Sequence, residues 1–236
     1  MSLFDTVVNT QSRPLPVIIL ADNSGSMSEN GSLDSLKHAL RDMIESFKNS
    51  SSSALEADIY VSVISFGNQK ADIVLAPKSA NEIANSGELA KVLDSMVADG
   101  DTPLGLALNK LISMLEDKSI YPSRAYRPFI VLASDGYPND DWEGPLNQLL
   151  NNDRCKKATR LSLAIGPAAD RDMLKRFINN EDLPVFSANS AVEIKYFFKC
   201  VTMSAIRSSQ SAKPGEIAPN DIISLSESVK ALFDED

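Results

Sequence analysis

The sequence predicts an α/β domain in which helices cover both faces of a doubly wound, mainly parallel sheet. Short apolar runs rich in β-branched residues alternate with segments whose apolar residues recur every three or four positions. Strands that alternate with helices in this way are joined by right-handed crossovers and pair in parallel. The 236 residues are 43% hydrophobic and 23% charged, which is a globular composition.

Short apolar runs define the expected strands. The first, PVIILA at 16–21, is continuously apolar, as is typical of a strand buried on both faces. The others are residues 58–66, 129–133, 161–165 and 185–186. Gly67-Asn68 predicts a turn, after which residues 71–75 can return as a hairpin partner of 58–66.

Helical periodicity defines the expected helices. In residues 31–48 the apolar side chains fall on one face of a helix. The remaining expected helices are residues 89–97, 104–115, 142–150, 170–178 and 192–206.

The organisation along the chain predicts one domain over residues 14–208, preceded by an N-terminal arm, residues 1–13. Residues 209–236 begin as a polar linker with Pro and Gly and continue with apolar residues at helical spacing. This C-terminal part ends in Asp-Glu-Asp. Two alternatives stay open for it, a helix docked on the domain and a free acidic interaction tail.

Composition and charge exclude several classes of protein. No apolar run approaches the roughly 18 residues of a membrane-spanning helix, and the first residues lack an apolar core of signal length, so we expect a cytoplasmic protein. The net charge of −9 would repel nucleic acid and anionic membrane surfaces, and neither is an expected partner. Cys155 and Cys200, without a CxxC pattern, fit buried residues in a reducing compartment. The single histidine, His38, cannot build a zinc site.

Oxygen-bearing side chains follow two of the expected strands and open one helix. In a doubly wound sheet, ligands bind beyond the carboxyl ends of the strands, where the strand order reverses. The three segments are Asp22-Asn23-Ser24-Gly25-Ser26, Asp101-Thr102-Pro103-Leu104-Gly105 and Ser134-Asp135-Gly136-Tyr137-Pro138. Each segment alone also fits an ordinary turn or a helix cap. Together they predict a site for a hard divalent cation, Mg²⁺ or else Mn²⁺ or Ca²⁺, because they offer carboxylates and hydroxyls. The candidate ligands are Asp22, Ser24, Ser26, Thr102 and Asp135.

The pattern Asp22-x-Ser24-x-Ser26, then Thr102, then Asp135-Gly136 resembles the metal-ion-dependent adhesion site of von Willebrand factor A domains. The resemblance covers residues 14–206. It implies a Rossmann-like, doubly wound, mostly parallel six-stranded sheet with helices on both faces and one antiparallel edge strand, for which residues 71–75 are the candidate. The phrase Leu-Ala-Asp-Asn-Ser-Gly-Ser-Met is most similar to bacterial TerY-type proteins of tellurite and stress-resistance gene clusters. That likeness implies kinase-like and phosphatase-like partners.

The function that the resemblance implies is a scaffold or regulatory module that binds a partner's Asp or Glu through the metal. The alternatives are a Mg²⁺-dependent hydrolase or phosphatase and a structural interaction domain whose site is rarely filled. Five acids flank the expected site and favour a donor carboxylate surrounded by Lys or Arg: Asp99, Asp101, Asp140, Asp141 and Glu143. Self-association is a further possibility, through Asp234, Glu235 or Asp236 on a neighbouring molecule's metal.

Overall fold

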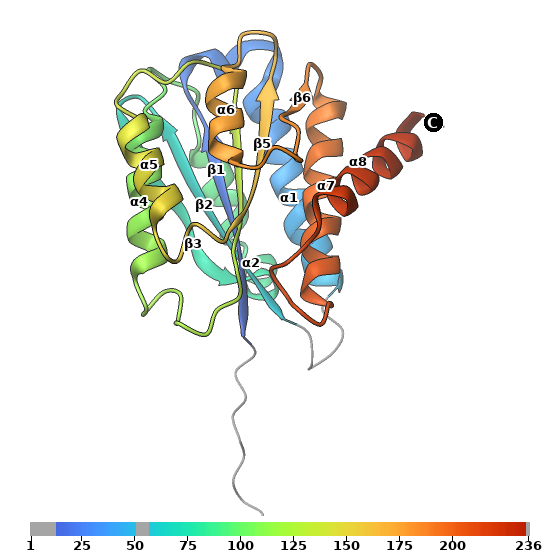
Figure 1. Cartoon of the computed structure of the whole chain (residues 1–236). Coiled ribbons are helices and arrows are strands. Elements are labelled where there is room, and N and C mark those ends of the chain that lie inside the picture. The colour runs from blue at the N-terminus through green and yellow to red at the C-terminus, as the bar shows by residue number, and fades with distance from the viewer. Residues whose placement is uncertain (1–12, 51–56, 235–236) are drawn as a thin grey trace, which may run out of the picture.

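A six-stranded sheet forms the centre of the computed structural model, which describes residues 13–50 and 57–234 (Figure 1). The strand order is β3-β2-β1-β4-β5-β6. The strands are β1 (Pro14–Asp22), β2 (Asp58–Gly67), β3 (Lys70–Ser79), β4 (Phe129–Ser134), β5 (Thr159–Ile165) and β6 (Phe186–Ala188). All neighbours pair in parallel except β2 and β3, which pair antiparallel at one edge. The predicted fold class and its antiparallel edge strand are therefore confirmed.

Strand β1 lies in the middle of the sheet, and every one of its nine residues is buried. Val17 and Ile19 contribute to the hydrophobic core on one face, whereas Ile18 and Leu20 contribute to the core on the other face. Successive side chains of a strand point to opposite faces, so a strand between two helical layers must be apolar at every position. This explains the continuous apolar run in the sequence.

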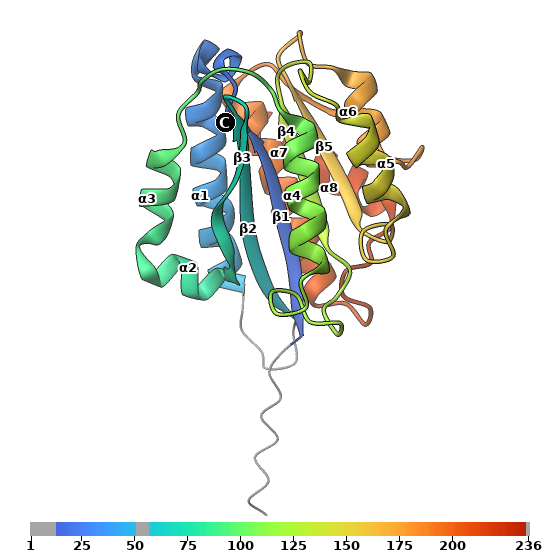
Figure 2. The ribbon, with the colours of Figure 1, turned by 90° about the vertical axis from the view of Figure 1, so that its left-hand side faces the viewer.

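Helices cover both faces of the sheet (Figures 1 and 2). Buried side chains of α1 (Ser32–Ser50), α2 (Ala80–Ser86), α3 (Glu88–Ser95) and α7 (Ala191–Ser209) belong to one core. Those of α4 (Leu104–Glu116), α5 (Glu143–Asn151) and α6 (Arg171–Ile178) belong to the other, except Ile178 at the end of α6, which belongs to the first. No helix in the described ranges is long and apolar enough to span a membrane.

The β2–β3 hairpin turns on two residues with positive φ, Asn68 at 47° and Gln69 at 59°. Positive φ at both central residues defines a type I′ turn, whose twist matches that of the paired strands. Gly67 precedes this turn because a Cβ there would stand 2.6 Å from the carbonyl oxygen of Asn23. The glycine therefore lets the hairpin approach the loop that follows β1.

Three details differ from the sequence-based expectation. A 3₁₀ segment, η1 (Gly25–Gly31), precedes α1, so the helix expected from residue 31 is preceded by another helical turn. Helix α2 was not expected; it begins where the Ser79 hydroxyl accepts a hydrogen bond from the Glu82 amide, and Gly87 at φ 67° separates it from α3. The helix expected to reach residue 97 ends at Ser95, because Met96 is extended.

The C-terminal part forms helix α8 (Pro219–Asp234), which packs on α7 and diverges from it toward the C-terminus (Figure 1). Ile222 and Val229 are fully buried, and the Cys200 thiol lies 3.6 Å from the carbonyl oxygen of Ile222. Residues 1–12 of the expected arm and the expected tail residues Glu235 and Asp236 lie outside the described part of the chain.

Candidate metal centre

The candidate site begins where β1 and β4 end side by side, at the reversal of the strand order. Ala21 pairs with Ala133, so the next residues, Asp22 and Ser134, also lie next to each other. Both are buried. The Asp22 carboxylate accepts hydrogen bonds from the Ser134 hydroxyl at 2.5 Å and from the Ser24 amide at 2.8 Å. No local pattern in the sequence predicted this role of Ser134, because the pairing of the two strands creates it.

The hydroxyls that follow β1 connect Asp22 to Asp135. The Oγ atoms of Ser24 and Ser26 lie 3.2 Å apart. The Ser26 hydroxyl donates to Oδ1 of Asp135 at 2.8 Å, across 109 positions of the chain. Four of the five candidate residues are thus linked through a continuous set of short contacts.

Thr102 is the fifth candidate, and it faces the same point. A Cβ added to Gly136 would stand 3.6 Å from Oγ1 of Thr102 and 3.8 Å from Oγ of Ser26. These two hydroxyls therefore border the space above Gly136. The structure brings together all five residues that the sequence singled out.

The loop that carries Thr102 crosses the carboxyl ends of the strands between α3 and α4 (Figure 2). Backbone hydrogen bonds tie it to the loop after β1, from the Gly25 amide to the Gly100 carbonyl at 2.9 Å and from the Asp99 amide to the Asn23 carbonyl at 3.0 Å. Gly100 has φ of 61°, and a Cβ there would stand 2.6 Å from Cα of Asn68. This close packing of three loops fixes the position of Thr102.

Asn139 and Asp140 form hydrogen bonds with the backbone at the start of α4. The sequence did not predict this role for either residue. Oδ1 of Asn139 accepts a hydrogen bond from the Thr102 amide at 2.8 Å. The Asp140 carboxylate accepts hydrogen bonds from the amides of Gly105 and Leu106 at 2.9 and 3.0 Å. The alternative that Thr102 is a helix cap does not hold, because the N-cap residue of α4 is Pro103 and the side chain that accepts its first amides is that of Asp140. Asp140 lies 35 and 34 positions from Gly105 and Leu106 in the chain, so no local sequence pattern predicts these hydrogen bonds.

The five flanking acids do not all face solvent as free charges. Asp140 is engaged by α4, and Glu143 forms an ion pair with Arg176 at 2.5 Å. Asp99, Asp101 and Asp141 are exposed, although Asp99 accepts a hydrogen bond from the Asn68 amide group. The negative rim predicted from the sequence is therefore smaller than expected.

Burial disfavours the charged form of both carboxylates of the cluster. Burial raises the pKa of Asp22 from 3.8 to about 6, although hydrogen bonds from Ser134 and Ser24 oppose the rise. Burial also raises the pKa of Asp135, and the negative charge of Glu29 adds to the effect. A nearby cation favours the charged form of a carboxylate, so it would offset both effects.

The donor set and its spacing fit a hard divalent cation. All five side chains offer oxygen, and within the described residues no three His, Cys, Asp or Glu side chains gather as ligands, so a cation here depends on the hydroxyls. Oxygens that neighbour each other in an octahedral Mg²⁺ shell stand about 3.0 Å apart, because each lies ~2.1 Å from the ion. The separations of 2.8 and 3.2 Å between oxygens of the cluster are compatible with this spacing.

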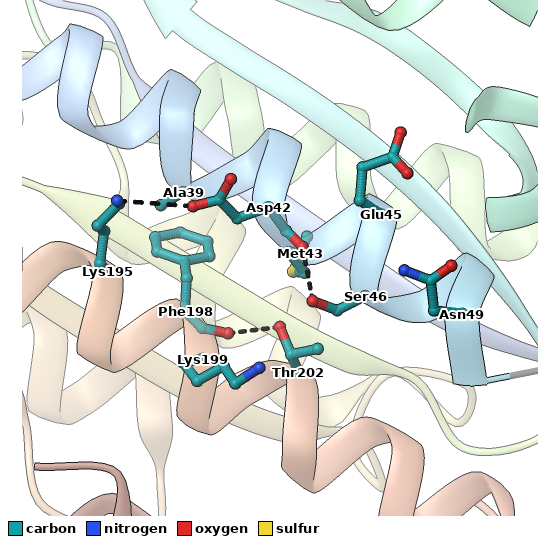
Figure 3. A pocket seen from close by; sticks show the side chains of 10 residues that line it. All are labelled: Ala39, Asp42, Met43, Glu45, Ser46, Asn49, Lys195, Phe198, Lys199 and Thr202. Carbon is teal, nitrogen blue, oxygen red and sulfur yellow. Dashed lines mark hydrogen bonds and ion pairs between the residues drawn. The ribbon is translucent and has the colours of Figure 1, made fainter. Parts of the chain in front are cut away.

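A groove of about 350 Å³ lies elsewhere, between α1 and α7 (Figure 3). Asp42 and Lys195 face each other across it at 3.8 Å. The Thr202 hydroxyl on its wall donates to the carbonyl oxygen of Phe198 at 2.6 Å. None of the candidate ligands lines this groove, and His38 is exposed on α1. The groove is therefore separate from the oxygen cluster, which remains the candidate functional site.

Solved structures share the fold at low sequence identity, and no curated protein sequence matches the chain. The pilus adhesin SpaC from Lactobacillus rhamnosus GG has a TM-score of 0.67 and 15% identity over 84% of this chain, which covers 31% of SpaC. The vWF domain of the pili tip protein Mfa5 from Porphyromonas gingivalis has a TM-score of 0.63 and 12% identity over 88% of this chain and 99% of that one. Proximal thread matrix protein 1 from the mussel byssus, solved with a zinc-occupied metal-ion-dependent adhesion site, has a TM-score of 0.61 and 16% identity over 83% of this chain and 48% of that one.

The family model of the von Willebrand factor type A domain matches residues 17–199, a range that starts in β1, ends in α7 and includes all five oxygen-bearing residues. The match spans most of the chain. The protein therefore belongs to the von Willebrand factor type A domain family.

Proposed function

We propose that this protein is a metal-dependent protein-binding module in which Asp22, Ser24, Ser26, Thr102 and Asp135 hold a divalent cation. The observation that carries the proposal is the contact between Ser26 and Asp135, which joins the ends of two strands at one point. Domains of this family commonly mediate metal-dependent protein interactions. Mg²⁺ is the proposed resident ion, with Mn²⁺ and Ca²⁺ as the alternatives.

The bound ion would act as a Lewis acid that accepts an Asp or Glu carboxylate from a partner. Three neutral hydroxyls and two carboxylates leave the ion able to take a further anionic oxygen, because the two negative charges only balance its own. Asp22 keeps its orientation through Ser134, and Asp135 through Ser26. These hydrogen bonds would hold the ligand oxygens in place before the ion arrives.

We also propose a biological setting for this module. The likeness of the first motif to TerY-type proteins supports a cytoplasmic bacterial scaffold in a tellurite or stress-response system, with kinase-like and phosphatase-like partners. The proposed organisation is one domain over residues 14–208 followed by the segment 209–236. Truncation after Phe233 removes Asp234, Glu235 and Asp236 and so tests self-association through the acidic end. It keeps Ile222 and Val229, which are buried against the domain.

A binding role is favoured over a Mg²⁺-dependent hydrolase or phosphatase. A hydrolase needs a general base within hydrogen-bond reach of the attacking water. His38 is exposed on α1, in a different element from the loops that carry the cluster. The net charge of −9 also disfavours an anionic phosphoester.

Thermal unfolding with and without metal tests the proposal. A ligand that binds only the folded state raises the midpoint by mass action, so millimolar Mg²⁺ or Mn²⁺ should stabilise the protein and EDTA should reverse the effect. Ser26→Ala and Asp135→Asn should abolish the shift. Ser113→Ala, which changes an exposed serine on α4, is the matched control and should keep it. The absence of any metal-induced shift in the unaltered protein would refute the proposal.

A further inference from the structure

Several segments that carry or adjoin the candidate metal centre bear exposed apolar side chains. Six large hydrophobic side chains are exposed among the residues that the structure describes: Ile73, Val97, Leu106, Tyr137, Val192 and Leu232. Three of them belong to segments that carry or contact the five ligand residues. These are Val97 at 65% exposure, Leu106 at 44% and Tyr137 at 65%.

Val97 lies in the loop that crosses the ends of the strands between α3 and α4 (Figure 2). Its carbonyl oxygen accepts a hydrogen bond from Nδ2 of Asn23 at 2.8 Å, and Asn23 directly follows Asp22. The backbone of Val97 is thus fixed against the loop after β1 while its side chain remains in solvent.

Tyr137 directly follows Gly136, the residue that faces the hydroxyls of Thr102 and Ser26. The segment is held on both sides of Tyr137. The Asp170 amide donates a hydrogen bond to the Gly136 carbonyl at 3.4 Å, and the Asn139 amide donates one to the Thr102 carbonyl at 3.1 Å.

Leu106 stands at the start of α4, where its amide donates to Asp140 at 3.0 Å. All three apolar side chains therefore project from backbone that hydrogen bonds already fix. Exposed apolar residues on such fixed backbone next to a ligand site are suited to binding a partner, because they gain burial with little loss of conformational entropy. Tyr is also among the residues that most often dominate binding energy.

The segments that carry the cluster and its neighbours also bear exposed acids. Glu29 belongs to the same short segment as Ser26, and Glu29, Asp99, Asp101 and Asp141 are all exposed. A partner carboxylate approaching the metal meets this repulsion unless cations accompany it. The face thus combines one site for an anionic oxygen with an apolar and an acidic border.

We propose that the partner surface is a protein segment whose donor Asp or Glu is flanked by aliphatic or aromatic side chains and by Lys or Arg. Tyr137 and Val97 are the main apolar contacts, and Leu106 extends them along α4. The apolar neighbours bury these residues, while the basic ones pair with the acidic border. This inference rests on the proposed metal-dependent binding function.

A peptide series tests the inference on the full-length protein saturated with Mn²⁺, with fluorescence anisotropy as the readout. The parent peptide has one central Asp flanked by leucines and then by lysines. Its relatives replace the Asp by Asn, the leucines by serines, or the lysines by glutamates. We expect the parent to bind only with metal and each relative to bind about tenfold more weakly or worse.

Protein variants locate the contact. Val97→Ala combined with Tyr137→Ala should weaken the parent peptide about tenfold and should leave the serine peptide unchanged. Val192→Ala combined with Leu232→Ala removes exposed apolar side chains from α7 and α8 and is the matched control, expected to bind the parent normally. Both double variants should keep the stabilisation by Mn²⁺, which shows that the metal centre is intact.

The outcomes separate the two proposals. If Mn²⁺ does not stabilise the unaltered protein, the proposed function fails and this inference fails with it. If Mn²⁺ stabilises the protein but the parent peptide does not bind, or binds equally to the Val97 and Tyr137 double variant, only the inference on the partner is overturned. Equal binding of the serine or glutamate peptide would overturn it as well.

Discussion

The Ser134 hydroxyl donates a hydrogen bond of 2.5 Å to the Asp22 carboxylate, linking the ends of the two central strands β1 and β4. The two residues are 112 positions apart in the chain, and both are buried. This bond orients an ionisable group whose charge burial disfavours. Ser134 is thus a positioning residue for the proposed metal centre, since its hydroxyl acts through Asp22.

Ser134→Ala should weaken metal binding about tenfold or more, because residues that orient metal ligands contribute to affinity on this scale. The measurement is the Mn²⁺ concentration needed to raise the unfolding midpoint. Ser162→Ala is the control: Ser162 is also fully buried, on β5, but its hydroxyl faces the carbonyl oxygen of Leu174 at 3.4 Å. Equal metal dependence in the two variants would contradict the role of Ser134.

Asp140→Ala should destabilise the fold by about 1–2 kcal/mol, because the carboxylate satisfies two free amides at the N-terminus of α4 and favours the helix dipole there. Urea unfolding measures the loss. Asp141→Ala changes the adjacent, exposed acid and should cost much less. A similar loss in both variants would show that the cap is not the cause.

Gly105→Ala should also damage this junction. A Cβ on Gly105 would stand 2.2 Å from the carbonyl oxygen of Asp141, so the loop that follows β4 must shift away from α4. That loop carries Asp135, and the expected result is loss of metal-induced stabilisation together with a lower unfolding midpoint. In contrast, Gly144→Ala should be mild, because the atom nearest to the added Cβ is a carboxylate oxygen of Asp141 at 3.5 Å. Unchanged metal binding in Gly105→Ala would argue against the close coupling of α4 to this loop.

Arg160→Met should destabilise the protein by about 2–3 kcal/mol, as expected when hydrogen bonds to a buried charged group are lost. The guanidinium is buried and donates to the carbonyl oxygens of Phe177, Ile178 and Cys155. The first two lie at the C-terminal end of α6, where a positive charge is favourable. Arg171→Met, at an exposed position, is the control in urea unfolding. Equal midpoints for the two variants would rule out this role for Arg160.

The two thiols should be inert in the folded protein at neutral pH. Burial raises the pKa of Cys155 and of Cys200 from 9.0 to about 11 in each case. A thiol reagent should therefore label both only as the chain unfolds. Because the folded state keeps these protons at pH values where the unfolded chain releases them, stability should fall as the pH rises between about 9 and 11. Rapid labelling of the native protein at neutral pH would contradict the burial of both groups.

Partner capture from native lysate, with and without EDTA, extends the metal prediction to natural ligands. Proteins retained through the ion should be released by EDTA and should be lost with Asp22→Ala. Retention that is indifferent to both changes would come from another surface.

Much of this protein follows from its sequence alone. The run at 16–21 predicted a strand buried on both faces, because every position is apolar and the run is short. The alternation of such runs with amphipathic segments predicted a layered α/β fold. The five candidate ligands were also recognisable, since each follows a strand or precedes a helix. Helix α2 escaped prediction because only a short segment with one capping serine marks it.

Only the tertiary structure decided what surrounds those five residues. The pairing of β1 with β4 places Ser134 on Asp22, and the packing of the loop after β4 against α4 engages Asp140. The exposure of Val97 and Tyr137 beside the cluster was equally invisible, because hydrophobic residues in a sequence are expected to be buried. These features depend on contacts between segments far apart in the chain, and no local pattern of residues encodes such contacts.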